Sequence, residues 1–293
     1  MMGCCYSYNI SKDFENNIVR YKGTVYKLGD IIGSGSFGRC IKCIDSRECV
    51  KIVKIRDNKI VNTYSGCLSG NIEMVFNEIK ILKRVDHPNI IKYIGDIRIC
   101  GNGYDHIIII TKFIEGVELF YYIHDILLTE MPAVAILQQI ADGIHYLHSN
   151  NIIHGDIKPE NIIINPITLK IVIIDLGSSH HPEQKVEPVG TDGYKAPELF
   201  IENYCYDKAI DIWAFGCIAF ILIALVYPYT PTSFYNIMSV GQCQPVPLYK
   251  LLATSLTYRS LVYNCLHKYP HKRFTSSQLV NIIKSYGIVG NFI

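Results

Sequence analysis

Charged side chains are scarce in this chain. They make up 18% of its 293 residues, whereas hydrophobic residues make up 49%, and a typical globular protein is about a quarter charged. This composition excludes an intrinsically disordered chain, which needs low hydrophobicity and a high net charge. The net charge is only +2, and the lysines and arginines are scattered along the sequence. Without a basic stripe, we expect no nucleic-acid partner.

The sequence also lacks a secretory signal, and its eleven cysteines are odd in number. These features predict free thiols in a reducing compartment, which means the cytoplasm or the nucleus. Cys40 and Cys43 form a C-x-x-C pair, but on an extended strand their thiols fall on opposite faces and no second pair accompanies them. We therefore expect neither a metal site nor a redox site there.

No hydrophobic run is long enough to cross a membrane. The longest candidate, residues 212–226, has fifteen residues and lies between Asp211 and the pair Tyr227-Pro228. A spanning helix needs about 20 apolar residues, so this run predicts a buried core helix. The length of the chain accommodates one large domain or two closely packed lobes.

Two short polar motifs carry the strongest chemical signal. One is His154-Gly155-Asp156-Ile157-Lys158-Pro159-Glu160-Asn161, and Asp175-Leu176-Gly177 begins fourteen residues after its end. Such acidic, lysine and asparagine groups are those needed to handle a hydroxyl nucleophile, a phosphoryl group and magnesium. The motifs resemble H-R-D-L-K-P-E-N and D-F-G of the eukaryotic-type serine/threonine protein kinase family.

The resemblance implies an α+β fold with two lobes, and the periodicity of the sequence agrees with it. Strand-like segments alternate up to residue 113 around one helix at residues 72–85, and a polar linker is expected at residues 56–70. Helices are expected later, at residues 211–225, 248–266 and 276–285. We predict an N-terminal extension at residues 1–25 and a kinase domain at 26–293, with an N-lobe at about 26–113 and a C-lobe at about 114–293.

The glycine-rich segment at residues 33–38 follows one predicted strand and precedes another. A dinucleotide-binding loop would precede a helix, so the segment instead matches the family's loop over the ATP phosphates. The resemblance places two small residues, Cys40 and Cys49, in the adenine pocket. It also assigns contacts to the segment that joins the lobes after the gatekeeper Thr111, and places Glu118 near the ribose. The nucleotide-binding set is Ile32, Gly33, Ser34, Gly35, Ser36, Phe37, Gly38, Cys40, Cys49, Lys51, Glu78, Lys112, Ile114 and Glu118.

Two lysines compete for the position that clamps the α- and β-phosphates. Lys51 follows Cys49, a small residue suited to the adenine pocket, whereas Lys54 has Ile52 at the corresponding place. We favour Lys51 on this steric ground. Glu78 lies nine residues before His87 and matches the helix glutamate that pairs with the clamping lysine, with Glu73 as the alternative.

The resemblance also implies the roles of the catalytic groups. Asp156 is the expected base for the substrate hydroxyl, Lys158 supplies positive charge to the γ-phosphate, and Thr191 bridges the two. Asn161 and Asp175 are the expected magnesium ligands. Lys158, together with the sequence from Gly190 to Tyr194, is typical of serine/threonine specificity.

Other matched positions imply structural roles. Glu198 is expected to form a buried ion pair with the distant Arg273, and Asp211 to support the catalytic loop. Gly155 stands where the family has an arginine that receives an activating phosphate. Leu176 replaces the family's phenylalanine.

The sequence thus predicts an ATP- and Mg²⁺-dependent protein serine/threonine kinase that acts on protein substrates. A pseudokinase scaffold and a small-molecule kinase are the alternatives. The abundance of Ile, Asn, Lys and Tyr indicates an AT-rich genome such as that of a poxvirus, which would place the protein in an infected host cell. Residues 2–7 match a myristoylation pattern only if translation starts at Met2, and only then do we expect membrane attachment.

Overall fold

The computed structural model describes residues 17–35, 38–100, 104–184, 190–200, 207–229 and 247–289. The chain forms two compact units. The N-terminal unit runs up to Asp86 and includes Ile91–Ile114, and the C-terminal unit consists of His87–Ile90 and the chain from Glu115 onward. The β-rich and mainly helical units match the predicted fold class.

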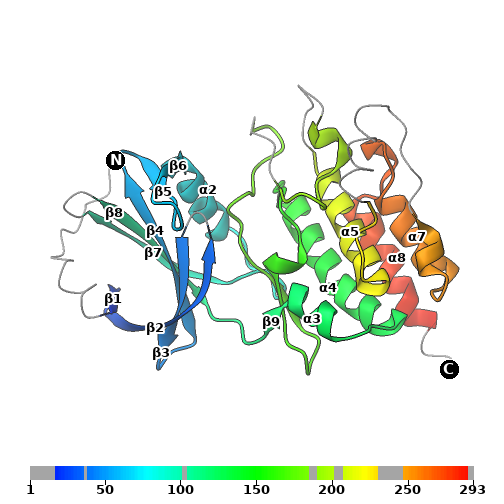
Figure 1. Ribbon diagram of the computed structural model, residues 1–293, viewed down its shortest axis with the longest axis horizontal. Coiled ribbons are helices and arrows are strands. Elements are labelled where there is room, and N and C mark those ends of the chain that lie inside the picture. The colour runs from blue at the N-terminus through cyan, green and yellow to red at the C-terminus, as the bar shows by residue number, and fades with distance from the viewer. Residues whose placement is uncertain are drawn as a thin grey trace. The chain divides into compact units, whose positions relative to one another are not determined.

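The N-terminal unit is built on one antiparallel sheet (Figure 1). Its path runs from β1 to β6 in chain order, and β8 pairs with both β4 and β7. The sequence of β8 is almost continuously apolar because the strand lies between two neighbours, β4 and β7. Its residues Ile107 to Ile110 are at most 1% exposed. The strands are β1 (Ile18–Tyr21), β2 (Thr24–Gly35), β3 (Gly38–Ile44), β4 (Glu48–Arg56), β5 (Lys59–Val61), β6 (Leu68–Asn71), β7 (Tyr93–Cys100) and β8 (Asp105–Lys112).

The expected polar linker at residues 56–70 is wrong, because β5 and β6 form a hairpin there. Asp57 and Asn58 form the two-residue turn between β4 and β5, and both have positive φ, 51° and 58°. Such a turn matches the twist of paired strands. Ile60 and Val61 then become buried. Two adjacent apolar residues among polar neighbours do not show the alternation that predicts a strand.

A single helix, α2 (Ile72–Leu82), follows the hairpin. The side chain of Asn71 caps it by accepting a hydrogen bond from the amide of Glu73 at 3.1 Å. Its apolar residues recur at helical spacing, and Val75 and Ile79 are buried. The helix ends three residues before the predicted Val85.

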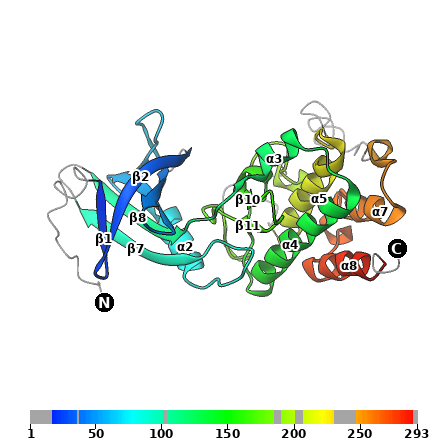
Figure 2. The same cartoon turned by 90° about the horizontal axis from the view of Figure 1, so that it is seen from below.

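The C-terminal unit is mainly helical, with a small three-stranded sheet (Figure 2). Its helices are α3 (Leu119–Asp125), α4 (Glu130–Ser149), α5 (Ala209–Ala224), α7 (Leu256–Cys265) and α8 (Ser276–Val289). Short 3-10 helices are η1 (Pro159–Asn161), η2 (Pro197–Phe200), η3 (Leu248–Leu251) and η4 (Pro270–Lys272). The strands are β9 (Val117–Glu118), β10 (Ile162–Ile164) and β11 (Ile171–Ile173).

Helix α5 is the centre of this unit. Every residue from Ile210 to Leu222 is buried, which explains a hydrophobic run without helical periodicity. At Gly216 a Cβ atom would come within 2.7 Å of the Cβ of Cys265, so the glycine permits the close contact of α5 with α7. Among the described residues, no helix is long and apolar enough to span a membrane.

The helix predicted at residues 248–266 is divided into η3 and α7. The reason is Ser255, whose hydroxyl accepts a hydrogen bond from the amide of Tyr258 at 3.1 Å and starts a new helix. Periodicity alone does not reveal this break, because apolar residues continue on both sides of it.

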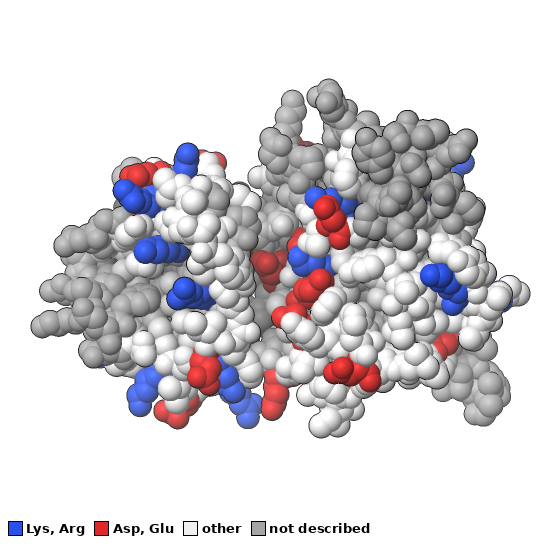
Figure 3. All heavy atoms as spheres, in the orientation of Figure 1, with Lys and Arg blue, Asp and Glu red and all other residues white. Residues whose placement is uncertain are grey.

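Charged side chains are spread over the face of the molecule that Figure 3 shows. Figure 3 shows separate lysine, arginine and acidic side chains on a largely uncharged face, and no continuous basic stripe among the described residues visible there.

The predicted ion pair between Glu198 and Arg273 is present. Two guanidinium nitrogens donate to the two carboxylate oxygens at 2.6 and 2.7 Å, and both side chains are buried. Arg273 also donates to the carbonyl of Ala209 at 3.0 Å and lies over the ring of Trp213. One side chain therefore links η2 to the start of α5.

We expect Arg273→Ala to lower the free energy of unfolding of the C-terminal unit by about 3–5 kcal/mol, because it leaves Glu198 buried without its partner. Urea denaturation followed by fluorescence of Trp213 measures this change. Arg259→Ala, at a partly exposed arginine of α7, is the control and should change the stability little. Equal stability of the two variants would contradict a stabilising role for the ion pair.

Candidate active site

The described residues of the glycine-rich segment end β2 and begin β3, with Gly35 opposite Gly38. A Cβ atom at Gly38 would lie 2.7 Å from the carbonyl oxygen of Ile52, so packing requires a glycine there. At Gly33 the nearest atom would be the Cβ of Cys40, at 3.8 Å. Packing does not explain this second glycine, and the open space suits the close approach of a ligand to the backbone. The predicted contacts Ser36 and Phe37 lie outside the described residues.

Three more predicted nucleotide contacts lie on the same strands. Ile32 is half exposed on β2, and Cys40 on β3 is opposite Lys51 in the register. Cys49 on β4 is opposite Thr111 on β8, and its sulfur lies 3.2 Å from the threonine hydroxyl. Burial raises the pKa of the Cys49 thiol, although the hydrogen bond to Thr111 opposes this shift. The thiol therefore remains protonated at neutral pH.

Of the two candidate lysines, Lys51 and Lys54, it is Lys51 that forms the ion pair with Glu78. Its ammonium group donates to the two carboxylate oxygens of Glu78 at 2.8 and 2.9 Å. Lys54 instead lies over the ring of Tyr104, 3.6 Å from the centroid. Glu73, the alternative to Glu78, is exposed on α2. Strand alternation explains the choice, because residues three apart on β4 point to opposite faces.

The remaining predicted nucleotide contacts follow β8. The Lys112 amide donates to the carbonyl of Lys92 at 2.9 Å, and Ile114 is partly buried at the end of the N-terminal unit. Glu118 belongs to β9 of the C-terminal unit and pairs with Ile163. Burial raises the pKa of Glu118 and so does the negative charge of Glu160, whereas Lys158 lowers it.

Three predicted catalytic residues and the predicted magnesium ligand Asn161 form one network in the C-terminal unit. The hydroxyl of Thr191 donates to Asp156 Oδ1 at 2.8 Å and accepts a hydrogen bond from Lys158 Nζ at 2.6 Å. Lys158 Nζ lies 2.9 Å from Asp156 Oδ2. The amide nitrogen of Asn161 donates to the Asp156 carbonyl at 2.8 Å and to Oδ2 at 3.2 Å. These contacts fix the Asp156 carboxylate in one orientation.

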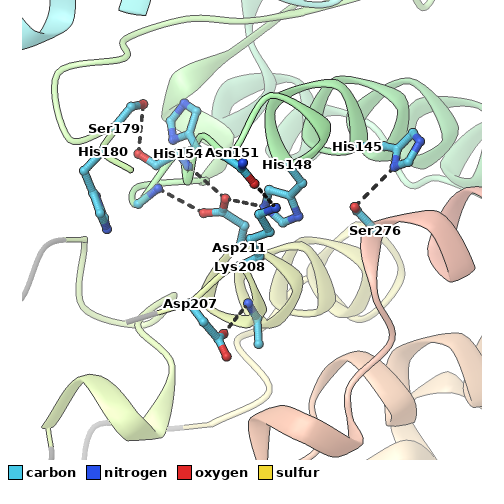
Figure 4. Close-up of polar contacts among 12 residues, drawn as sticks. His145, His148, Asn151, His154, Ser179, His180, Asp207, Lys208, Asp211 and Ser276 are labelled. Atoms are coloured by element: carbon cyan, nitrogen blue, oxygen red, sulfur yellow. Dashed lines mark hydrogen bonds and ion pairs between the residues drawn. The ribbon is translucent and has the colours of Figure 1, made fainter. Parts of the chain in front are cut away.

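A buried carboxylate from α5 holds the backbone of this loop (Figure 4). Asp211 accepts hydrogen bonds from the amides of His154 and Gly155 at 2.8 and 3.0 Å, and its Oδ2 lies 2.8 Å from Nε2 of His148. Burial alone would raise the pKa of Asp211, but its hydrogen bonds and the nearby histidines outweigh burial and lower it. Asp211 therefore stays ionised and binds the loop amides strongly.

His148 is the supporting residue that sequence reasoning missed. It lies near the end of α4, is 4% exposed and contacts Asp211, 63 positions further along the chain. The available signal was a histidine in the last turn of an otherwise apolar helix, six residues before His154. The sequence alone does not show that His148 contacts Asp211, because the two residues are far apart in the chain.

Asp175 begins the second motif in an unusual backbone conformation. Its φ is 60°, its side chain is exposed, and its Oδ1 accepts a hydrogen bond from the Gly177 amide at 3.2 Å. The adjacent Ile174 amide donates to the Asn161 carbonyl at 2.8 Å, which links the two motifs. Leu176 is fully buried, so it fills an apolar site as expected.

The oxygen groups of Asn161 and Asp175 fit a hard cation such as magnesium. Asn161 directs its amide nitrogen at Asp156, so its amide oxygen points elsewhere and can act as a ligand. Within the described segments, no group of three or more His, Cys, Asp or Glu residues is arranged to hold a metal ion. A carboxylate and an amide suit magnesium, which usually keeps several waters and also binds phosphate oxygens.

Comparison with known proteins identifies the family of this chain. A family model described as "Protein kinase domain" matches residues 26–282. The similar curated proteins include calcium/calmodulin-dependent protein kinase type 1B of Homo sapiens, which is 30% identical over 87% of this chain and 73% of its own length. The type 1 enzyme of Macrobrachium nipponense is 32% identical over 70% of this chain and 58% of its length.

A third relative is the calcium/calmodulin-dependent protein kinase cmkA of Emericella nidulans, which is 30% identical over 71% of this chain and 49% of its own length. The chain therefore spans only about half of some relatives. These three relatives come from a mammal, a crustacean and a fungus, and they do not test the predicted viral source. The matched region covers both units and all the motifs described above, and the chain belongs to the protein kinase family.

Proposed function

We propose that this chain transfers the γ-phosphate of ATP to serine and threonine hydroxyls of protein substrates. The observation that carries the proposal is the contact of Thr191 with both Asp156 and Lys158. This contact joins the segment after the D-L-G motif to the catalytic loop. It presents a fixed carboxylate beside a fixed ammonium group, as transfer to a hydroxyl requires.

Asp156 acts as the base that orients the substrate hydroxyl and accepts its proton. Its Oδ1 is engaged by Thr191 and its Oδ2 by Lys158, so the carboxylate does not have to reorganise when the hydroxyl arrives. Lys158 is 19% exposed, and its charge counters the negative charge that develops on the transferred group.

We propose roles for the residues of each unit by itself. Asn161 and Asp175 would supply oxygen ligands to Mg²⁺, which when bound neutralises the charge of the phosphates. Lys51, oriented by Glu78, would contact the α- and β-phosphates. The β2–β3 hairpin would cover the phosphates, with Cys40 and Cys49 beside the adenine and Glu118 near the ribose.

Two other functions are weighed against this one. A pseudokinase scaffold is disfavoured because the chain has Lys51, Asp156, Asn161 and Asp175. A small-molecule kinase is disfavoured because the segment from Gly190 to Glu198 resembles the part of protein kinases that binds protein substrates. Incubation with Mg²⁺, labelled ATP and generic protein substrates separates the three. Label on serine and threonine supports the proposal, whereas label only on small molecules, or no label, contradicts it.

The place of action and the partners are also proposals. We infer that the chain acts in the cytoplasm or nucleus on protein substrates. Membrane association is expected only for a form that is lipidated from Met2.

We expect Asp156→Asn to lower kcat by about two to four orders of magnitude, because it removes the carboxylate that accepts the proton and keeps the side-chain volume. ATP binding should remain near that of the parent. Phosphate transfer and fluorescent-nucleotide titration measure the two effects. Asp192→Asn, at a carboxylate that is 90% exposed in the same region, is the matched control and should keep parental activity. Turnover of Asp156→Asn within a few-fold of the parent would refute the assignment.

Lys51→Met should lower kcat/KM for ATP by about a hundredfold or more, because it removes the ammonium group that Glu78 orients. Lys54→Met, which removes a contact with the Tyr104 ring instead, should leave kcat/KM nearly unchanged. Initial rates at several ATP concentrations give both values. The reverse order of the two effects would transfer the clamping role to Lys54.

Activity should not need a phosphate on the segment from Ser178 to Lys195, because Gly155 offers no guanidinium group to receive one. Ser179 is 1% exposed and donates to the His154 carbonyl, so its hydroxyl is already used inside the protein. Phosphatase-treated enzyme should keep its initial rate. A large loss of rate that is restored when Ser178, Ser179 or Thr191 is phosphorylated would contradict this prediction.

A further inference from the structure

The loop between β5 and β6 is a closed turn. The Asn62 amide donates to the Cys67 carbonyl at 2.8 Å, and the Gly66 amide donates to the Asn62 carbonyl at 2.9 Å. The side-chain oxygen of Asn62 accepts hydrogen bonds from the amides of Tyr64 and Ser65, both at 3.0 Å. These four bonds restrain a loop of only six residues, and they fix the direction in which Tyr64 leaves the backbone.

This turn is attached firmly to the sheet. β5 pairs with β4 across the two-residue turn described above, and β6 pairs with β5. Ile60 and Val61 are 1% and 9% exposed, so removing the hairpin from the sheet would expose apolar surface. Tyr64 therefore stands on a rigid support within the N-terminal unit.

The hydroxyl of Tyr64 donates a hydrogen bond to the carbonyl of Ser34 in the glycine-rich segment. Burial does not explain this tyrosine, since its side chain is 69% exposed. The segment it reaches has little packing of its own. Ser34 is exposed and pairs with Arg39 on β3, and a Cβ at Gly33 would meet nothing closer than 3.8 Å. The Tyr64 hydroxyl thus restrains this part of β2 from a second, independent element.

We propose that Tyr64 is a positioning residue that holds residues 33–35, at the end of β2, ready for the nucleotide phosphates. The inference rests on the ATP-dependent activity proposed above. Few side chains pack against residues 33 and 34 of β2. The apparent affinity for a ligand falls in proportion to the fraction of the protein in the receptive conformation. The hydrogen bond from Tyr64 raises that fraction without touching the nucleotide or the catalytic loop.

The test is Tyr64→Phe, which keeps the ring and removes the hydroxyl. KM for ATP and the dissociation constant of a fluorescent ATP analogue should rise about two- to tenfold, the effect of one hydrogen bond. kcat, KM for the protein substrate and the thermal midpoint without nucleotide should stay unchanged. Tyr249→Phe is the matched control, because this tyrosine of the C-terminal unit is also 69% exposed. It should change none of these values.

A second pair of variants tests the hydrogen bonds of Asn62 that orient Tyr64, rather than the hydroxyl of Tyr64 itself. Asn62→Ala removes the acceptor that orients Tyr64 and should raise KM for ATP in the same direction. Asn62→Asp keeps an acceptor oxygen and should restore the parental value. An unchanged or lower KM for ATP in Tyr64→Phe would overturn the proposal, as would a loss of kcat with unchanged KM.

Hydrogen exchange at residues 33–35 separates failure of this inference from failure of the proposed function. Exchange should be faster in Tyr64→Phe than in the parent and in Tyr249→Phe, whether or not the parent phosphorylates proteins. A parent without activity would overturn the proposed function alone. Equal exchange in the parent and Tyr64→Phe would overturn the role of Tyr64.

Discussion

The ionised carboxylate of Asp211 is the interaction on which the catalytic loop depends. It is 1% exposed and receives two backbone amides of the loop together with His148. Its position in the first turn of α5 is favourable for a negative charge, because the amides at a helix N-terminus are positively polarised. The loop that carries Asp156 is thereby fixed to the most deeply buried helix of the unit.

The same helix is fixed from the other side by Arg273. This residue binds Glu198, the Ala209 carbonyl and the face of Trp213. The start of α5 therefore receives the catalytic loop through Asp211 and the η2 segment through Arg273. Two buried ionic clusters, both satisfied by hydrogen bonds, set the relative positions of segments that are far apart in the sequence. Each cluster would be costly to leave half formed.

The sequence predicted the ion pair of Glu198 with Arg273 and the bridge of Thr191 between Asp156 and Lys158, because matched motifs carry such pairings with them. The small size of Cys49 favoured Lys51 over Lys54, and the structure confirms the contact of Lys51 with Glu78. The β5–β6 hairpin was not predicted, because its buried apolar residues, Ile60 and Val61, are two adjacent ones among mainly polar neighbours. The break at Ser255 was missed for the opposite reason, since apolar spacing continues across it. His148 and Tyr64 act through partners that are distant in the chain, so local patterns do not show their roles.

Gly155 has a consequence beyond the geometry of the loop. Its φ is 82°, and its amide is committed to Asp211, so the position serves the backbone alone. These contacts all lie within the C-terminal unit, so the backbone conformation of the loop that carries Asp156 is set when that unit folds.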